Sequence, residues 1–320
     1  MSRKLVISLP PHFHAPGSVA GCMWRVTAAL LPAFLCSVFF FGIGALAVTA
    51  ISILACVGFE YAISRWLLGV TPRISDGSAA LTGFLLALNL PSNLPPWIVI
   101  IGAFVAIGIG KMAFGGLGCN IFNPALVGRV FLLLSFPAQM TSWPVPGGDL
   151  MAYTDAATGA TVLQLVKSGA VSFSDVDLWR QAVGNTAGSL GEVSALALLV
   201  GFAYLLFKRV ISWHIPVSVC AAAAVLAWCV GANPLVELLS GGMLLGAIFM
   251  ATDYVTSPMT RKGMVVYGAM IGIITIVIRL WGAYPEGMSF AILIMNGFTP
   301  LINRIFVPRR FSAGRRAAAL

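Results

Sequence analysis

The sequence predicts an all-α protein that crosses a membrane many times, and three observations support this fold class. Of its 320 residues, 59% are hydrophobic and only 9% are charged, a balance far outside that of soluble globular domains. Apolar segments recur along the whole chain, and a bilayer core takes about 20 residues of helix. Glycine, which is common in transmembrane helices, occurs 34 times. We therefore expect a polytopic membrane protein of about ten transmembrane helices.

Ten apolar segments have the length of a membrane-crossing or a broken helix. The third, fifth and eighth are short, which is expected where a helix is broken or re-enters the membrane. In chain order the expected segments are Trp24–Phe41, Ala45–Leu68, Ser78–Leu90, Trp97–Phe114, Asn123–Phe136, Gly191–Leu206, Trp213–Val230, Leu235–Met250, Met264–Leu280 and Met288–Phe306.

These segments divide the chain into five parts. Residues 1–22 form an N-terminal arm, in which Arg3 and Lys4 are followed by prolines rather than by the apolar stretch of a signal peptide. The first apolar segment is therefore expected to remain in the mature protein. The other parts are a first membrane repeat at 23–136, a hydrophilic loop at 137–188, a second membrane repeat at 189–307 and a basic tail at 308–320.

The distribution of lysine and arginine predicts the orientation in the membrane. An even number of spans places both termini on one side, and if that side is cytoplasmic it holds 15 of the 19 basic residues. Only Lys167, Arg180 and Arg279 fall outside it, while Arg129 lies within the fifth segment. We therefore expect cytoplasmic termini and an extracytoplasmic loop. The same bias explains the net charge of +9 without a nucleic-acid partner.

The two membrane halves resemble each other. Residues 83–91 and 120–125 have weak counterparts at 246–253 and 295–301, in the same order. Five spans per half is an odd number, so the two copies would run in opposite directions, as in transporters that build a midplane site from broken helices. We expect two inverted five-helix repeats, although convergence of glycine-rich membrane helices would produce the same similarity.

The hydrophilic loop contains the run DAATGAT at positions 155–161. Its simplest interpretation is a surface turn followed by a helix that Thr158 or Thr161 caps. The run also looks like the flavinylation motif Asp-x-x-(Ser/Thr)-Gly-Ala-(Thr/Ser), in which the last hydroxyl receives FMN through a phosphoester bond. This resemblance implies that Thr161 is the acceptor and that a flavin transferase outside the cytoplasm reads Asp155, Thr158, Gly159 and Ala160.

Four further stretches are similar to the D subunit of the Rnf complex and to the B subunit of the sodium-pumping NADH:quinone reductase. They lie at residues 76–83, 90–91, 115–125 and 188–194. The B subunit has a longer N-terminal extension, whereas the first expected span begins here at Trp24. This difference favours the Rnf family member.

The resemblance implies a urea-transporter-like architecture in the bacterial inner membrane and a role in an ion-translocating ferredoxin:NAD oxidoreductase. The chain would relay electrons through its flavin, which performs the redox chemistry, so no side chain is expected to be catalytic. The implied partners are a second flavinylated subunit, a cytoplasmic iron–sulfur subunit and the lipid bilayer. No glycine-rich nucleotide loop occurs, so NAD is expected to bind elsewhere in the complex.

Residues 115–125 combine three glycines, Asn120, Asn123 and one proline at a cytoplasmic entry to the membrane. Glycine in membrane helices most often permits close packing, and Asn-Pro most often breaks a helix. Irregular backbone at this depth also occurs where it lines a cavity. The resemblance to the B subunit implies a non-covalent riboflavin near this side, with Asn120 and Asn123 as candidate hydrogen-bond partners.

Two charged residues are further candidates, because charges within a membrane are costly and often functional. Arg129 falls inside a short span and needs a partner, which either a flavin phosphate or a carboxylate would provide. Asp253 follows the eighth segment and would help to bind a cation or to orient a flavin. Its alternative role is that of a cytoplasmic helix end close to Arg261 and Lys262.

No metal centre is expected in this chain. The six cysteines stand apart, without a CxxC pattern or a nearby histidine at ligand spacing. Two alternative functions remain open beside the electron relay. One is a B-type subunit of a quinone reductase, and the other is a flavin-free channel or transporter for a small solute. In the electron relay, either Na⁺ or H⁺ would be the coupling ion.

Overall fold

The computed structural model describes residues 18–72, 74–147, 150–151, 153–154, 156–173, 176–282, 284 and 286–307. The arm up to residue 17, the tail at 308–320 and Asp155 therefore lie outside the described residues. Most of the described chain is helical. Five helices are long and apolar enough to cross a membrane, namely Val19–Phe41, Ile43–Leu67, Pro96–Phe114, Arg261–Trp281 and Met288–Ile305.

The helices of the first half begin and end at residues that favour those positions. Ser18 caps the first helix by accepting a hydrogen bond from the backbone of Gly21, and Asn123 caps the fifth. The elements are α1 (Val19–Phe41), α2 (Ile43–Ala62) with η1 (Ile63–Leu67), η2 (Ile74–Asp76), α3 (Ser78–Leu88), α4 (Pro96–Phe104) with η3 (Val105–Ile109), η4 (Met112–Phe114) and α5 (Pro124–Ser135).

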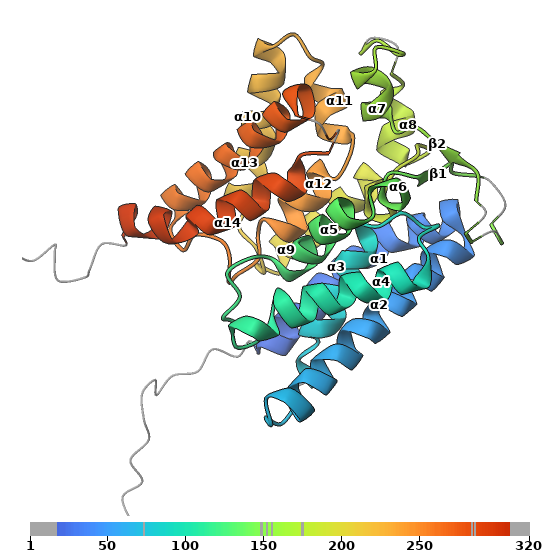
Figure 1. Ribbon diagram of the computed structural model, residues 1–320. Coiled ribbons are helices and arrows are strands. Elements are labelled where there is room, and N and C mark those ends of the chain that lie inside the picture. The colour runs from blue at the N-terminus through green and yellow to red at the C-terminus, as the bar shows by residue number, and fades with distance from the viewer. Residues whose placement is uncertain are drawn as a thin grey trace, which may run out of the picture.

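The loop that follows is not purely helical, because it contains a short antiparallel strand pair. This loop contains α6 (Pro137–Met140), β1 (Trp143–Pro144), β2 (Thr158–Gly159), α7 (Val162–Lys167) and α8 (Leu178–Val183). The second half contains η5 (Leu190–Glu192), α9 (Ala195–Phe207), α10 (His214–Cys229), α11 (Pro234–Leu239), α12 (Met243–Leu245), η6 (Gly246–Met250), α13 (Arg261–Trp281) and α14 (Met288–Ile305). In Figure 1 the loop elements lie at the upper right, and the C-terminal end of α14 lies at the left.

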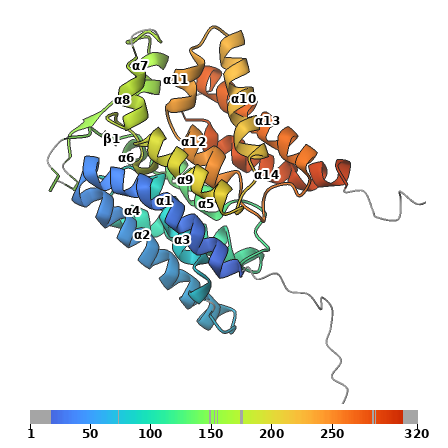
Figure 2. The same cartoon turned by 180° about the vertical axis from the view of Figure 1, so that it is seen from behind.

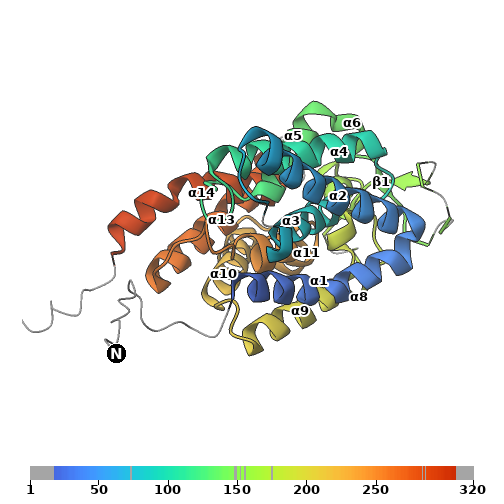
Figure 3. The same cartoon turned by 90° about the horizontal axis from the view of Figure 1, so that it is seen from below.

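Glycines allow close helix packing in the second half and between the halves. A Cβ atom on Gly272 of α13 would overlap the carbonyl oxygen of Val219 on α10. A Cβ atom on Gly201 of α9 would likewise overlap the carbonyl oxygen of Ala29 on α1. In lipid no hydrophobic effect drives two helices together, so their association depends on close packing. Small residues allow this packing because they let the two backbones approach each other. Figures 2 and 3 both show α9 beside α1, so the two halves share this contact.

The outer surfaces of these helices carry many exposed apolar side chains. Examples are Phe39 on α1, Trp66 on η1 and Phe207 on α9. A soluble protein rarely exposes contiguous apolar surface of this kind, and lipid covers it in a membrane protein. The exposed side chains therefore support the membrane location that the composition predicts.

The eighth expected segment is not one helix, which corrects the prediction of a single helix over Leu235–Met250. Helix α11 ends at Leu239, Ser240 is extended, and Gly241 has a φ of +65° that favours glycine. Arg279 stabilises this bend, because its Nη2 donates a hydrogen bond to the Ser240 carbonyl over 2.9 Å. The chain becomes helical again at α12 and continues into the π-helix η6.

Short helices from the two halves meet inside the molecule. Asn89, at the C-terminal end of α3, places its amide nitrogen 3.6 Å from the sulfur of Met250 at the end of η6. Asn123, at the start of α5, donates to the Met250 carbonyl over 3.2 Å. These contacts satisfy polar groups where the helices end, which is necessary because no water is available in a membrane interior. They also place Arg129 of α5 near the centre.

Candidate flavin and ion site

Thr161 caps helix α7, as the simplest interpretation of its run expects. Its Oγ1 accepts a hydrogen bond from the Gln164 backbone over 3.3 Å, and Gln164 Oε1 accepts one from the Thr161 backbone over 3.0 Å. This reciprocal pair is a capping box. The threonine is only 6% exposed. Its hydroxyl donates a hydrogen bond to no described residue.

The residues before Thr161 pair with an earlier part of the loop. Thr158 and Gly159 form β2, which runs antiparallel to Trp143 and Pro144, and the Val145 backbone donates to the Ala157 carbonyl over 2.9 Å. Thr158 and Ala160 are exposed, whereas Trp143 is buried. The strand pair therefore holds residues 158–160 at the surface, and the chain becomes buried at Thr161.

Two side chains attach the loop to the membrane helices. Tyr153 donates its hydroxyl to the Leu94 carbonyl over 2.7 Å, and Lys167 donates to the Gly282 carbonyl over 2.5 Å. Burial raises the pKa of the Tyr153 hydroxyl above its ordinary value and lowers the pKa of the Lys167 ammonium.

Thr161 borders a small recess, which we call the Thr161 recess. It lies where α7, α8 and η5 meet the bend after α11. Its polar lining side chains come from separate parts of the chain. They are Thr161, Gln181, Thr186, Glu192, Ser240 and Glu286.

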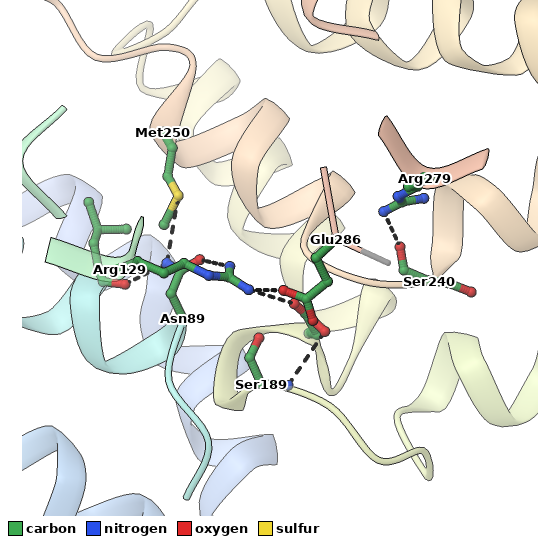
Figure 4. Close-up of polar contacts among 9 residues, drawn as sticks. Asn89, Arg129, Ser189, Ser240, Met250, Arg279 and Glu286 are labelled. Carbon is green, nitrogen blue, oxygen red and sulfur yellow. Dashed lines mark hydrogen bonds and ion pairs between the residues drawn. The ribbon is translucent and has the colours of Figure 1, made fainter. Parts of the chain in front are cut away.

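Arg129 reaches the edge of this recess from the centre of the molecule. The residue is 3% exposed, and its guanidinium donates to Asn89 Oδ1 over 2.5 Å and pairs with Glu286. Glu192 Oε1 lies 3.9 Å from Arg129 Nη2. Figure 4 shows the side chain extended between Asn89 at one end and Glu286 at the other. The partner that the sequence required is thus a carboxylate.

A second recess, which we call the Asn120 recess, contains the other candidates. Asn120, Asn123 and Asp253 line it, together with Lys111 and mostly apolar side chains such as Phe249. The structure therefore brings together residues that lie far apart in the sequence. Apolar side chains with polar groups among them are typical of small-molecule sites.

The side-chain amides of Asn120 and Asn123 differ in which hydrogen-bonding atoms remain without a partner among the described residues. Asn123 Oδ1 accepts from the Ala125 backbone over 3.1 Å and its Nδ2 donates to Met250, so its amide is fully engaged. Asn120 Nδ2 donates to the Phe122 carbonyl over 3.1 Å, and no described residue donates to its Oδ1. Asn120 is thus the asparagine with a free acceptor in this recess.

Asp253 is not a helix-end residue paired with a neighbouring cation. No described lysine or arginine lies within ion-pairing distance of its carboxylate, so the expected proximity to Arg261 and Lys262 does not produce a salt bridge. Its Oδ2 accepts instead from the Thr256 hydroxyl over 3.1 Å. The carboxylate faces the Asn120 recess because the chain breaks after η6.

A buried ion pair at the same recess could not be predicted from sequence spacing. Lys111 Nζ lies 2.6 Å from Glu60 Oε2 and 2.7 Å from Ser78 Oγ, and both charged side chains are almost fully buried. The partners are 51 positions apart in the chain. Gln181, Glu192 and Glu286 were likewise not identified as site residues, since nothing local to each residue predicts a shared recess.

A chain of polar contacts connects the two recesses. Asn123, which lines the Asn120 recess, contacts the Met250 carbonyl, and Asn89 contacts the Met250 sulfur. Asn89 then accepts from Arg129, which pairs with Glu286 at the Thr161 recess. Figure 4 shows the part of this chain from Met250 through Asn89 and Arg129 to Glu286. The two recesses are therefore connected through Met250, Asn89 and the buried Arg129.

Comparison with known proteins gives a match over nearly the whole chain. The sequence model of the NQR2, RnfD, RnfE family matches residues 6–312. The D subunit of the Na(+)-translocating ferredoxin:NAD(+) oxidoreductase complex of Acetobacterium woodii is 46% identical over 303 residues, which cover 94% of this chain and 93% of that protein.

Two other relatives are similar over the same extent. The D subunit of the proton-translocating ferredoxin:NAD(+) oxidoreductase complex of Clostridium ljungdahlii is 41% identical over 323 residues, covering 97% of this chain and 96% of the relative. The D subunit of the ion-translocating oxidoreductase complex of Stutzerimonas stutzeri is 38% identical over 338 residues, covering 95% of each.

Proposed function

The chain belongs to the NQR2, RnfD, RnfE family, and from this membership we propose that it is the membrane-embedded electron-relay subunit of an ion-translocating ferredoxin:NAD oxidoreductase complex. Its relatives are named as D subunits of such complexes, which favours this role over that of a quinone-reductase subunit or a solute channel. The other flavinylated and iron–sulfur subunits of the complex would exchange electrons with it, and NAD would bind to one of those partners.

The central part of this proposal is that FMN is attached to Thr161. The position of the Thr161 hydroxyl is the observation that supports it. The hydroxyl borders a recess, donates to no described acceptor, and follows the surface run that a transferase would read. An ester oxygen at this position would still accept the hydrogen bond from the Gln164 backbone, so attachment would keep the helix cap. The bound flavin would supply the electron transfer, while the chain would supply its position and electrostatic surroundings.

The burial of Thr161 limits when a transferase could reach its hydroxyl. At 6% exposure the hydroxyl cannot enter the active site of another enzyme while α7 is packed. Helix α7 has six residues, and a helix this short depends on its packing for stability. We therefore infer that the transferase acts while the loop is open, before α7 packs against the recess.

We further propose that a second, non-covalent flavin binds in the Asn120 recess. The recess is mostly apolar, and Asn120 Oδ1 offers a free acceptor to a ring N–H group. Asn123 would act indirectly by holding the end of η6 in place. Riboflavin has no phosphate, so Arg129 is not needed for it and remains bound to its carboxylate partner.

The membrane arrangement of this proposal has ten spans in two inverted five-helix repeats, with a urea-transporter-like architecture. Both termini would be cytoplasmic and residues 137–188 would be extracytoplasmic, which places Thr161 on the side where a flavin transferase works. The meeting of α3 and η6 at Asn89 and Met250 supports this arrangement, because inverted repeats bring their broken helices together near the midplane.

In-gel fluorescence of the denatured protein tests the covalent flavin. After expression with a flavin transferase, the wild-type band should fluoresce, Thr161→Ser should retain the signal because serine keeps the hydroxyl, and Thr161→Ala should lose it. Thr186→Ala is a matched control, since it removes another threonine of the same recess. A mass increase of one FMN on the Thr161 peptide would locate the bond.

A wild-type band without fluorescence under these conditions would exclude the covalent flavin. The same Thr161→Ala protein also tests the second flavin, because any flavin that it retains after mild purification is non-covalent. That flavin should be riboflavin and should appear in the supernatant after denaturation. A supernatant free of flavin would contradict the proposed ligand of the Asn120 recess.

A further inference from the structure

Helix α7, which Thr161 caps, is joined to the membrane helices by one charged side chain. Lys167 is the last residue of α7, and its Nζ donates to the Gly282 carbonyl over 2.5 Å and to the Tyr284 carbonyl over 3.3 Å. Gln164 is engaged in the cap itself. In the described part of the chain, Lys167 is the one α7 side chain that hydrogen-bonds to another part of the fold. The polar attachment of α7 therefore depends on a single residue.

The two acceptors of this contact lie at the C-terminal end of α13. Gly282 is the C-cap residue of that helix, and the last carbonyls of a helix have no partner within it. A lysine ammonium suits such carbonyls, because its charge also complements the negative end of the helix dipole. The contact is exposed to water, so water replaces the lost partners when it breaks. It is therefore a charge-assisted contact that can open and close.

The segment that contains the acceptors is held in place by contacts of its own. Glu286 pairs with the buried Arg129, and the ring of Tyr284 stacks on the ring of Phe290, with the two centroids 5.8 Å apart. Neither contact involves α7. The acceptor segment therefore stays in place when the Lys167 contact breaks, and α7 is the part that moves.

The apolar packing of α7 is slight. Leu163 is the one buried residue within this helix, and a Cβ atom added to Gly241 would lie 3.0 Å from its Cδ1. A helix of six residues is not stable by itself in water. Elements with few buried apolar contacts are also those that open most readily. The Lys167 contact is therefore a large part of what keeps α7 packed.

We propose that the bond from Lys167 to the Gly282 and Tyr284 carbonyls is a latch, which keeps α7 closed with Thr161 buried and exposes Thr161 when it breaks. This proposal rests on the proposed function, in which a transferase must reach the Thr161 hydroxyl, and it names the contact that regulates that access. The flavin itself takes no part in the latch. Opening of α7 is thus a property of the chain before any cofactor is attached.

Cysteine labelling measures this opening directly. Thr161→Cys is introduced into the full chain in detergent, in a background that keeps Cys56 and replaces the other native cysteines, and a maleimide then reacts at position 161 when α7 is open. Lys167→Met removes the charged donor and keeps a long apolar side chain, so labelling at position 161 should become about tenfold faster or more. Lys167→Arg keeps a charged donor and should label nearly as slowly as the lysine protein. Arg180→Met is the matched control, because it removes an exposed cation of the same loop and should leave the rate unchanged.

Cys56 separates local opening from a general loss of stability. This native cysteine lies on α2 and is 0% exposed. Its labelling should be as slow in Lys167→Met as in the protein that keeps Lys167. A parallel rise at Cys56 would overturn the latch, since the whole fold would then have loosened. An unchanged labelling rate at position 161 would overturn it as well.

Flavin attachment provides a second measurement, made on the chain with Thr161 intact. When a flavin transferase is added to the folded, flavin-free protein, in-gel fluorescence should appear faster with Lys167→Met than with wild type, and Arg180→Met should match wild type. Equal rates for Lys167→Met and wild type would overturn the control of access by Lys167.

The two measurements keep the latch and the covalent flavin separate. Faster labelling at position 161 without fluorescence in any variant would reject the covalent flavin and support the latch. Fluorescence in wild type with unchanged labelling in Lys167→Met would support the covalent flavin and reject the latch.

Discussion

Arg129 shows how a single buried residue connects otherwise separate parts of this molecule. The sequence indicates only that a charge within a short apolar segment needs a partner. That partner, Glu286, lies 157 positions away and follows α13, while Asn89 comes from the end of α3. Since the three residues belong to different helices and loops, their association depends on how those elements pack.

Substitution of Arg129 should therefore be severe. Arg129→Leu leaves the Glu286 carboxylate and the Asn89 side-chain carbonyl without their arginine donor, and breaking a buried ion pair costs about 3–5 kcal/mol. Arg180→Leu is a suitable control, because that arginine is exposed and its pair with Asp177 is worth less than about 1 kcal/mol. Both values can be measured by denaturant unfolding in detergent.

A double variant checks the cause of this loss. Adding Glu286→Gln to Arg129→Leu removes one of the unpaired charges and should recover part of the stability. If the double variant is as unstable as the sum of the two single variants, the ion pair does not explain the cost.

Helix α5 illustrates the scale of a whole element. Its start at Asn123-Pro124 follows ordinary local rules, because asparagine caps a helix and proline suits the first turn. The same asparagine also donates to the Met250 carbonyl at the end of η6, which a local rule does not predict. The cap and the contact together fix α5 against the broken helix of the other half.

Two substitutions separate these roles of Asn123. Asn123→Ser keeps a capping oxygen but is too short to reach Met250, so it should lose about 1 kcal/mol for the buried hydrogen bond. Asn123→Ala should lose about 1 kcal/mol more, because the cap is lost as well. The unfolding midpoints in detergent should fall in the order wild type, serine, alanine. Equal midpoints for serine and wild type would show that the Met250 contact adds no stability.

At the scale of the whole molecule, the loop with Thr161 and the C-terminal end of α14 lie at opposite ends in Figure 1. This separation agrees with a membrane that lies between them, as the distribution of lysine and arginine predicts. The five long apolar helices and the exposed apolar side chains account for the membrane location itself. The side of the membrane on which each loop is expected to lie is a prediction from the lysine and arginine distribution alone.

Cysteine labelling of intact spheroplasts tests this orientation. Ser168 and Lys208 are both exposed, and they lie on opposite predicted sides of the membrane. In a background without native cysteines, Ser168→Cys should react with a membrane-impermeant maleimide in intact cells, whereas Lys208→Cys should react only after permeabilisation. Labelling of Lys208→Cys in intact cells would reverse the orientation, and equal labelling of both would contradict the span count between them.

The sequence by itself determined the membrane class, the approximate positions of most long apolar helices and the family resemblance from which Thr161 is proposed as the flavin site. These features depend on local composition and on residues close together in the chain, where hydrophobic length and capping rules apply. Only the tertiary structure decided that the eighth segment bends at Gly241, that Arg129 pairs with Glu286, and that Gln181 and Glu192 share a recess with Thr161. Such contacts depend on packing between distant elements, and the residues near each partner carry no signal of it.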